Sequence, residues 1–207
     1  MHSLLTDSWD RAWTGVGAHG DGYTARDAVL GSYGDASRRY HSLQHLQECL
    51  ALFESVRGLC ERPAEVEVAL WFHDAIYVLT SSLNEEHSAQ WAREVLLQAG
   101  VQLGTADYVG ELILATKHSA LPDRQDAKVL VDVDLSILGA DKERFDEYER
   151  QIRDEYAFVP QPAFVQKRRE ILQSLLARPS IYGTPEMQRR FEDRARANLS
   201  LAVDALA

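Results

Sequence analysis

Apolar residues recur at intervals of three and four along much of this sequence, which is the spacing of one face of an α-helix. The clearest run is Leu43, Leu46, Leu50, Phe53 and Val56. The same spacing occurs in the stretches 65–74, 85–99, 107–117, 141–156, 164–177 and 186–206. Strand evidence is confined to the short β-branched run Val129–Val133, which stands between helical stretches. We therefore expect an all-α fold, a bundle of roughly eight helices.

The length and composition favour one globular domain. The chain has 207 residues, of which 45% are hydrophobic, and this suffices for a full core without disulfide or metal staples. We expect a single domain over residues 1–207, with a motif-bearing core at about 38–140 and C-terminal helices at 141–207, the first of them capped by Asp141. Cys49 and Cys60 form no CxxC pair, and we expect both to be small buried residues.

The charge and the absence of targeting patterns narrow the class of partner. The formal net charge of −10 disfavours binding of a nucleic acid polymer. No stretch approaches about 18 consecutive apolar residues, so we expect no membrane span. The N-terminal residues lack the pattern of a signal peptide, and cysteines are few, so we expect a cytoplasmic protein.

Histidines and acids in apolar surroundings point to a metal site. His41 and His45 lie four residues apart at the start of an expected helix, and His73-Asp74 follows an apolar run. Asp132 and Asp134 alternate with valine and leucine. A carboxylate in such a run is costly to desolvate unless a positive partner compensates it. Imidazoles and carboxylates together suit a divalent ion, namely Mn, Fe, Ni, Zn or, less well, Mg.

These residues belong to motifs that occur in a fixed order. They are Arg38-x-Tyr40-His41-x-Leu43-x-His45, Trp71-Phe72-His73-Asp74-Ala75-x-Tyr77, Asn84-Glu85-x-x-Ser88-Ala89 and Asp132-x-Asp134-Leu135-Ser136-Ile137-Leu138-Gly139. From about Arg38 to Leu199 the sequence resembles the HD-domain metal-dependent phosphohydrolases, in particular a bacterial branch of unsettled substrate. The resemblance implies an all-helical HD-like fold. It also implies a ligand set of His41, His73, Asp74 and Asp134. His45 competes with His41 in this set, and Asp132 competes with Asp134.

Other residues near the motifs are candidates for catalysis or substrate binding. We expect catalytic roles for Asp74, Glu85 and His118, the last of which resembles a family position that binds phosphate or a second metal. The alternative for His118 is a histidine favoured by the C-terminal end of a helix dipole. For Glu85 the alternative is an acidic first helical turn. Candidate substrate-binding residues are Arg38, Lys117, His45 and Tyr77.

The expected function is hydrolysis of a small phosphorylated substrate, a nucleotide or another phosphomonoester, by metal-activated water. One alternative is a metal- and nucleotide-binding sensor or interaction module without turnover. A third, less favoured, is an HD-type di-iron oxygenase, for which His45 and His118 would supply extra ligands. The sequence leaves open the substrate, the identity and number of the metal ions, and whether the chain forms a homodimer.

Overall fold

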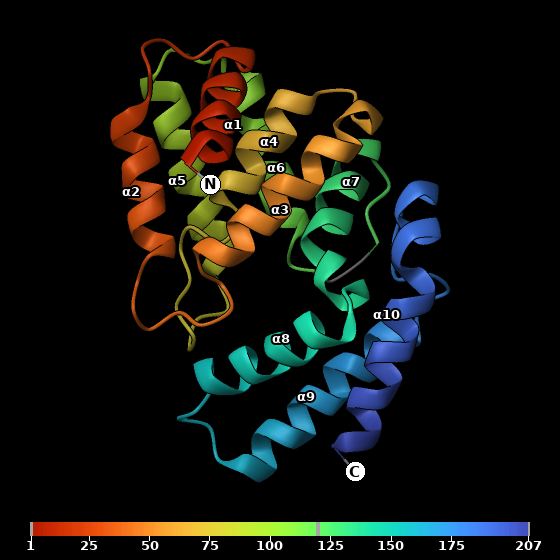
Figure 1. Cartoon of the computed structure of the whole chain (residues 1–207). Helices are drawn as coiled ribbons and strands as arrows, with labels where there is room; N and C mark the ends of the chain where they lie inside the picture. Colours follow the sequence, from red (N-terminus) through yellow and green to blue (C-terminus); the bar gives the residue numbers. More distant parts are fainter. Residues whose placement is uncertain (1, 119–120, 207) are drawn as a thin grey trace. The chain divides into compact units, whose positions relative to one another are not determined.

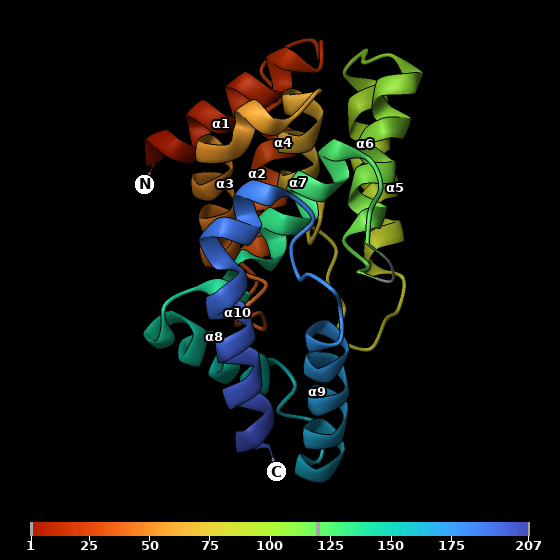
Figure 2. The ribbon, with the colours of Figure 1, turned by 90° about the vertical axis from the view of Figure 1, so that its right-hand side faces the viewer.

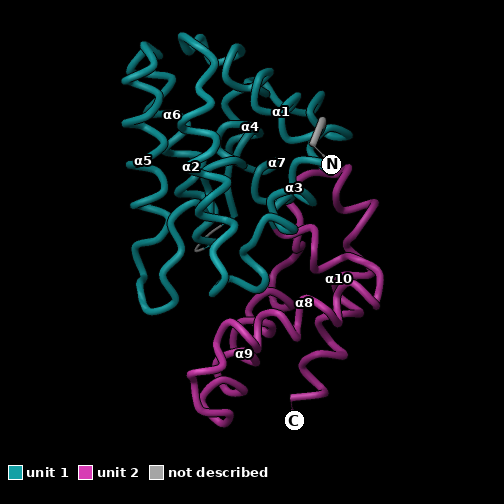
Figure 3. The backbone as a smooth tube through the Cα atoms, turned by 60° about the vertical axis from the view of Figure 1, so that its left-hand side comes forward, with its two compact units in different colours: residues 1–134 teal, residues 135–207 magenta. Residues whose placement is uncertain are grey.

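The computed structural model describes residues 2–118 and 121–206, and within these ranges the chain is all-helical. The described residues form ten α-helices and two short 3₁₀ helices (Figure 1). The expectation of an all-α fold is therefore confirmed, with more helices than the expected number. Two compact units divide the chain at Asp134, unit 1 over Met1–Asp134 and unit 2 over Leu135–Ala207 (Figure 3). That the whole chain is one HD-like domain stays a prediction.

Unit 1 contains seven α-helices and one 3₁₀ helix in the part that the structure describes. They are α1 (His2–Gly15), α2 (Tyr23–Tyr33), α3 (Leu43–Val56), η1 (Arg57–Leu59), α4 (Pro63–Phe72), α5 (Asn84–Gln98), α6 (Leu103–Ala115) and α7 (Gln125–Asp134). Helices α5 and α6 lie side by side, as Figure 2 shows.

Helix α4 is the centre of unit 1. It contacts α1, α3, α5, α6 and α7. Residues 66–72 are all buried, and they include the fully buried Leu70, Trp71 and Phe72. A helix that is buried and mostly apolar around its circumference belongs inside a core, so the surrounding helices cover it. Its C-terminal end therefore opens into the interior of the unit, where His73 and Asp74 follow.

Helix α1 is tied to α4 by a buried polar contact. Glu67 of α4 is fully buried and accepts a hydrogen bond from Ser8 Oγ at 2.6 Å. Its other oxygen accepts from Arg11 Nε at 3.0 Å. The rings of Trp9 and Trp13 stack at 5.1 Å beside this contact. These long-range partners explain why α1 forms although the sequence lacks an extended apolar repeat there.

Unit 2 contains η2 (Leu135–Gly139), α8 (Lys142–Glu155), α9 (Gln161–Leu176) and α10 (Pro185–Ala205). Helix α10 contacts both η2 and α9. Asn198 of α10 donates hydrogen bonds to the carbonyl oxygens of Leu138 and Ala140, at 2.9 and 3.0 Å. The expected cap is confirmed, since the Asp141 side chain accepts from the backbone N–H of Arg144 at 3.0 Å.

Most predicted helices occur with shifted ends, and one segment has a different structure from its local pattern. The β-branched run Val129–Val133 lies inside α7, where it is buried. Helices α1 and α2 add to those that the periodicity predicts. Among the described helices, none is both long enough and apolar enough to cross a lipid bilayer.

Candidate metal centre

Four side chains from distant parts of unit 1 bring nitrogen and oxygen donors together. They are His45 of α3, His73 and Asp74 just after α4, and Asp134 at the end of α7. The Nε2 atoms of His45 and His73 lie 3.1 Å apart. Asp74 Oδ2 lies 3.4 Å from His45 Nε2 and 3.1 Å from His73 Nε2. Asp134 Oδ1 lies 3.2 and 3.5 Å from the same two atoms.

The turn that carries His73 and Asp74 is held by hydrogen bonds to its backbone. Helix α4 ends at Phe72, so the chain is free to turn both neighbouring side chains toward one point. The backbone N–H of Asp74 donates to Tyr33 Oη at 3.1 Å. The guanidinium of Arg38 donates to the carbonyl oxygens of Asp74 and Ala75, at 2.6 and 3.0 Å. Tyr33 and Arg38 thus fix the direction of this turn.

The ring of His73 is oriented by the helix that precedes it. Its Nδ1 lies 2.8 Å from the carbonyl oxygen of Leu70, one of the last carbonyls of α4. A carbonyl oxygen only accepts, so Nδ1 carries a hydrogen and donates it. Nε2 is therefore the ring nitrogen that faces His45, Asp74 and Asp134, and it offers a lone pair once its proton is lost. Such a second contact is how proteins usually orient a metal-binding histidine.

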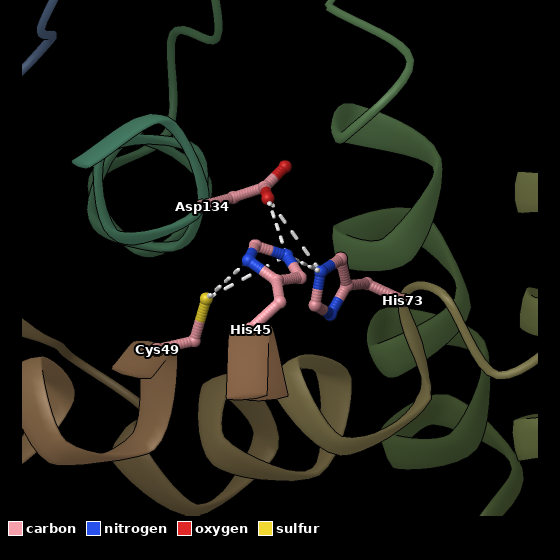
Figure 4. A group of neighbouring side chains, drawn as sticks. All are labelled: His45, Cys49, His73 and Asp134. Atoms are coloured by element: carbon pink, nitrogen blue, oxygen red, sulfur yellow. Dashed lines mark hydrogen bonds and ion pairs between the residues drawn. The ribbon is translucent and has the colours of Figure 1, made fainter. Parts of the chain in front are cut away.

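Cys49, which the sequence predicts only as a small buried residue, lies beside the cluster. Its Sγ lies 3.7 Å from His45 Nδ1, one helical turn along α3, and both residues are buried. In Figure 4 it stands on the side of His45 away from His73. His45, Cys49, His73 and Asp134 form a group whose donor atoms all lie within 4.8 Å of one another. The spacing of four between His45 and Cys49 is the sequence signal that could have revealed this.

The pKa values of the cluster describe a tightly coupled set of charges. Burial raises the pKa of Asp74, but the positive charges of His73 and His41 lower it by more. The net pKa of Asp74 therefore lies well below its ordinary value. Burial also raises the pKa of Asp134, but hydrogen bonds from His118, His45 and His73 outweigh it and hold that pKa well below its ordinary value. Burial lowers the pKa of His45 and His73, yet the neighbouring thiol, phenol and carboxylate groups raise it well above 6.5.

The separations between donors match those around a single ion. Metal–ligand distances of about 2.1 Å put neighbouring donors about 3.0 Å apart in an octahedron and about 3.4 Å apart in a tetrahedron. The five separations that involve an imidazole Nε2 lie between 3.1 and 3.5 Å. Two imidazoles and two carboxylates also suit a divalent transition metal. The residues present therefore fit such an ion.

The exposed fractions show which side of the cluster faces solvent. The side chains of His45 and His73 are 2% and 1% exposed, whereas those of Asp74 and Asp134 are 15% and 12% exposed. The imidazoles thus form the sealed base of the cluster. The carboxylates lie on the side of the cluster that is more accessible to solvent.

His41 lies next to the cluster, before the helix that carries His45. Helix α3 begins at Leu43, so the four-residue spacing does not place His41 and His45 on one helical face. The ring of His41 stacks on Tyr77 with centroids 3.9 Å apart, and its centroid lies 6.1 Å from that of His45. The geometry favours His45 for the ligand set, and His41 as a ligand stays a prediction.

Of the remaining candidates, the structure brings His118 into contact with the cluster. His118 Nε2 lies 3.0 Å from Asp134 Oδ2. Lys117 forms an ion pair with Glu86, which raises the pKa of Lys117, and the charge of Glu85 adds to this increase. Asp134 is the acid of the Asp-x-Asp pair for which contacts with the two imidazoles are established, and Asp132 is buried.

Comparison of the chain with models of protein families, with curated proteins and with solved structures found no match. The geometry of the cluster is therefore the main observation that bears on function, and membership of the HD-domain family stays an expectation.

Proposed function

We propose that unit 1 binds a divalent transition-metal ion through His45, His73, Asp74 and Asp134, and that the protein is an HD-type metal-dependent phosphohydrolase. The observation that carries the proposal is the convergence of two imidazole nitrogens and two carboxylate oxygens at separations of 3.1 to 3.5 Å. These residues come from three separate segments of the chain. Hydrogen bonding of neutral side chains alone does not explain such a meeting.

Charge balance supports a cation at this point. Both carboxylates have a pKa well below the ordinary value, so they are ionised at neutral pH. In the protein without metal, protons on the two imidazoles supply the compensating charge. Two imidazolium groups with Nε2 atoms 3.1 Å apart would repel each other, however. One divalent ion neutralises both carboxylates and removes this repulsion.

When bound, the ion supplies Lewis acidity, which polarises a phosphoryl oxygen and lowers the pKa of water at the site. The chain's own residues supply the rest. Leu70 holds His73 in the tautomer that exposes Nε2. Tyr33, whose pKa burial raises to about 12, stays neutral and fixes the backbone of Asp74. The carboxylates and His118 lie on the more accessible side of the cluster, from which a substrate would approach.

The expected substrate is small and phosphorylated. The net charge of −10 disfavours a polyanion that must cover much of the surface. A nucleotide or another phosphomonoester needs only the neighbourhood of the ion. Tyr77 and His41, stacked at 3.9 Å beside the cluster, offer flat surfaces against which a base or sugar would pack.

The first experiment is a measurement of metal content, followed by turnover. Wild-type protein and Asp74→Ala are purified without chelator, incubated with Mn²⁺ and analysed for bound metal. We expect about one ion per wild-type chain and much less in the variant. Hydrolysis of a panel of nucleotides and phosphomonoesters is then measured with the loaded protein. A wild type that stays free of metal after loading would refute the metal site.

A specific observation favours a second candidate, a metal- and nucleotide-binding sensor without turnover. Arg38 donates to three backbone carbonyl oxygens, and Lys117 pairs with Glu86, so both cations already have partners in the fold. A phosphohydrolase uses such cations to offset phosphate charge. Saturable nucleotide binding by the metal-loaded protein without any product would select the sensor.

A further inference from the structure

His118 has a backbone conformation that is unusual for its residue type. Helix α6 ends at Ala115, and His118 follows three residues later with φ of 53°. This is the left-handed region, which glycine adopts without steric cost and other residues adopt at a cost. It is the non-glycine position with positive φ in the part of the chain that the structure describes. A histidine here needs a compensating contact.

That contact is a hydrogen bond to one oxygen of Asp134. His118 Nε2 lies 3.0 Å from Oδ2, while Oδ1 lies 3.2 Å from His45 Nε2 and 3.5 Å from His73 Nε2. The two oxygens of the carboxylate therefore have different partners. One faces the other donors of the cluster, and the other faces His118.

The position of His118 is supported from a second helix. Lys117, the preceding residue, forms an ion pair with Glu86 in the first turn of α5. The His118 side chain is 27% exposed, against 2% for His45. His118 thus stands at the accessible edge of the cluster, where a histidine that only terminated a helix would be free to turn outward.

We infer that His118 is a positioning residue, which donates Nε2–H to Asp134 Oδ2 and so reserves Oδ1 for the metal ion. The inference rests on the proposed metal site and adds to it. The strained backbone at position 118 is retained because it aims the imidazole at Asp134. His118 then does not bind an ion of its own, and the cluster holds one ion per chain.

Two substitutions separate the backbone from the side chain. His118→Gly removes the donor and relieves the left-handed strain. His118→Gln keeps an N–H donor near the place of Nε2. Its amide is a poor metal ligand and stays neutral at all pH values tested. Each variant and the wild type are titrated with Mn²⁺ by calorimetry, and each is unfolded with denaturant in the presence of chelator.

We expect His118→Gly to be at least as stable as the wild type without metal, yet to bind Mn²⁺ about 10- to 100-fold more weakly, the usual effect of losing an outer partner of a ligand. His118→Gln is expected to stay within about threefold of the wild-type affinity. All three proteins should bind the same number of ions.

Different failures have different meanings. Unchanged affinity in His118→Gly would overturn the positioning role. A wild type that binds two ions, one of them lost in both variants, would overturn it in favour of a second metal site at His118. A wild type that binds no ion would instead refute the proposed metal site, and the inference with it.

Discussion

At the scale of single residues, His73 shows how one side chain serves both fold and site. Its Nδ1 donates to Leu70 at the end of α4, and its Nε2 faces the other donors. The first contact satisfies a carbonyl that the helix leaves without an intrahelical partner. The second is available only because the first fixes the tautomer. The end of the helix therefore prepares the ligand.

The two neighbouring histidines are expected to differ in their effect on metal binding. His45→Ala should weaken Mn²⁺ binding by more than about 100-fold, beyond the range for outer partners, because it removes a donor. His41→Ala is the matched control and should cost less than about tenfold, because its ring stacks on Tyr77. Calorimetric titration of both variants measures this. A larger loss in His41→Ala than in His45→Ala would reverse the assignment.

Metal affinity is expected to rise with pH. Burial lowers the pKa of His45 and His73, but their polar neighbours, with Asp74 and Asp134 among them, raise it well above 6.5. These imidazoles therefore carry protons at neutral pH when no metal is bound. An incoming ion must displace those protons, and raising the pH removes them in advance. The gain should reach up to about tenfold per pH unit for each proton released. Titrations with Mn²⁺ between about pH 6 and about pH 8 test this, and an affinity independent of pH would contradict it.

At the scale of helices, three of the four proposed ligands lie at or just after the C-terminal end of a helix. Asp134 ends α7, and His73 and Asp74 follow α4 directly. Interior helices such as α4 therefore act as rigid supports with functional groups at their C-terminal ends. In unit 2, η2 packs closely against α10, and this contact depends on Gly139, which has no side chain.

Gly139→Ala is expected to destabilise unit 2. A Cβ atom at Gly139 would lie 2.6 Å from Phe191 Cβ and 2.8 Å from the Phe191 carbonyl oxygen. Since a backbone atom cannot move aside easily, we expect a loss of about 1 to 3 kcal/mol in the free energy of unfolding.

Gly104→Ala is the control. Gly104 lies in α6, and a Cβ atom added there would have no neighbouring atom of another segment within 4 Å. It should leave stability unchanged or raise it by up to about 1 kcal/mol. Denaturant unfolding of both variants measures the difference. Equal stabilities would show that η2 and α10 pack less closely than described.

At the scale of the whole molecule, all four proposed metal ligands belong to unit 1. Binding of a ligand stabilises the state that binds it, by about 2.7 kcal/mol when its concentration is about 100 times Kd. The gain should appear first in the segments that hold the donors.

Hydrogen exchange with and without Mn²⁺ is expected to localise this effect. Amides of α3, of the turn after Phe72 and of the end of α7 should exchange more slowly with the ion, because opening these segments breaks the site. Amides in α9 of unit 2 serve as the internal reference and should change little. Slowing confined to unit 2 would contradict the proposed location.

The sequence alone was sufficient for the helical class and for much of the candidate site. Apolar spacing predicted a helix through Leu43–Val56, although we expected it to include His41, which precedes α3. The cost of burying acids pointed to Asp74, Asp132 and Asp134, and the family resemblance implied Asp134 as the ligand. The Asp141 cap was predicted because capping is a local interaction. Each of these features depends on residues that are close in the chain.

Only the tertiary structure decided between His41 and His45 as the nearer donor and brought Cys49 beside the cluster. The spacing of four suggested one face for the two histidines, but α3 begins after His41, where the chain has no helical periodicity. Helix α1 likewise forms through contacts of Ser8 and Arg11 with the distant Glu67. Periodicity reports which face of a helix is buried, whereas the partners on that face are set by how the helices pack.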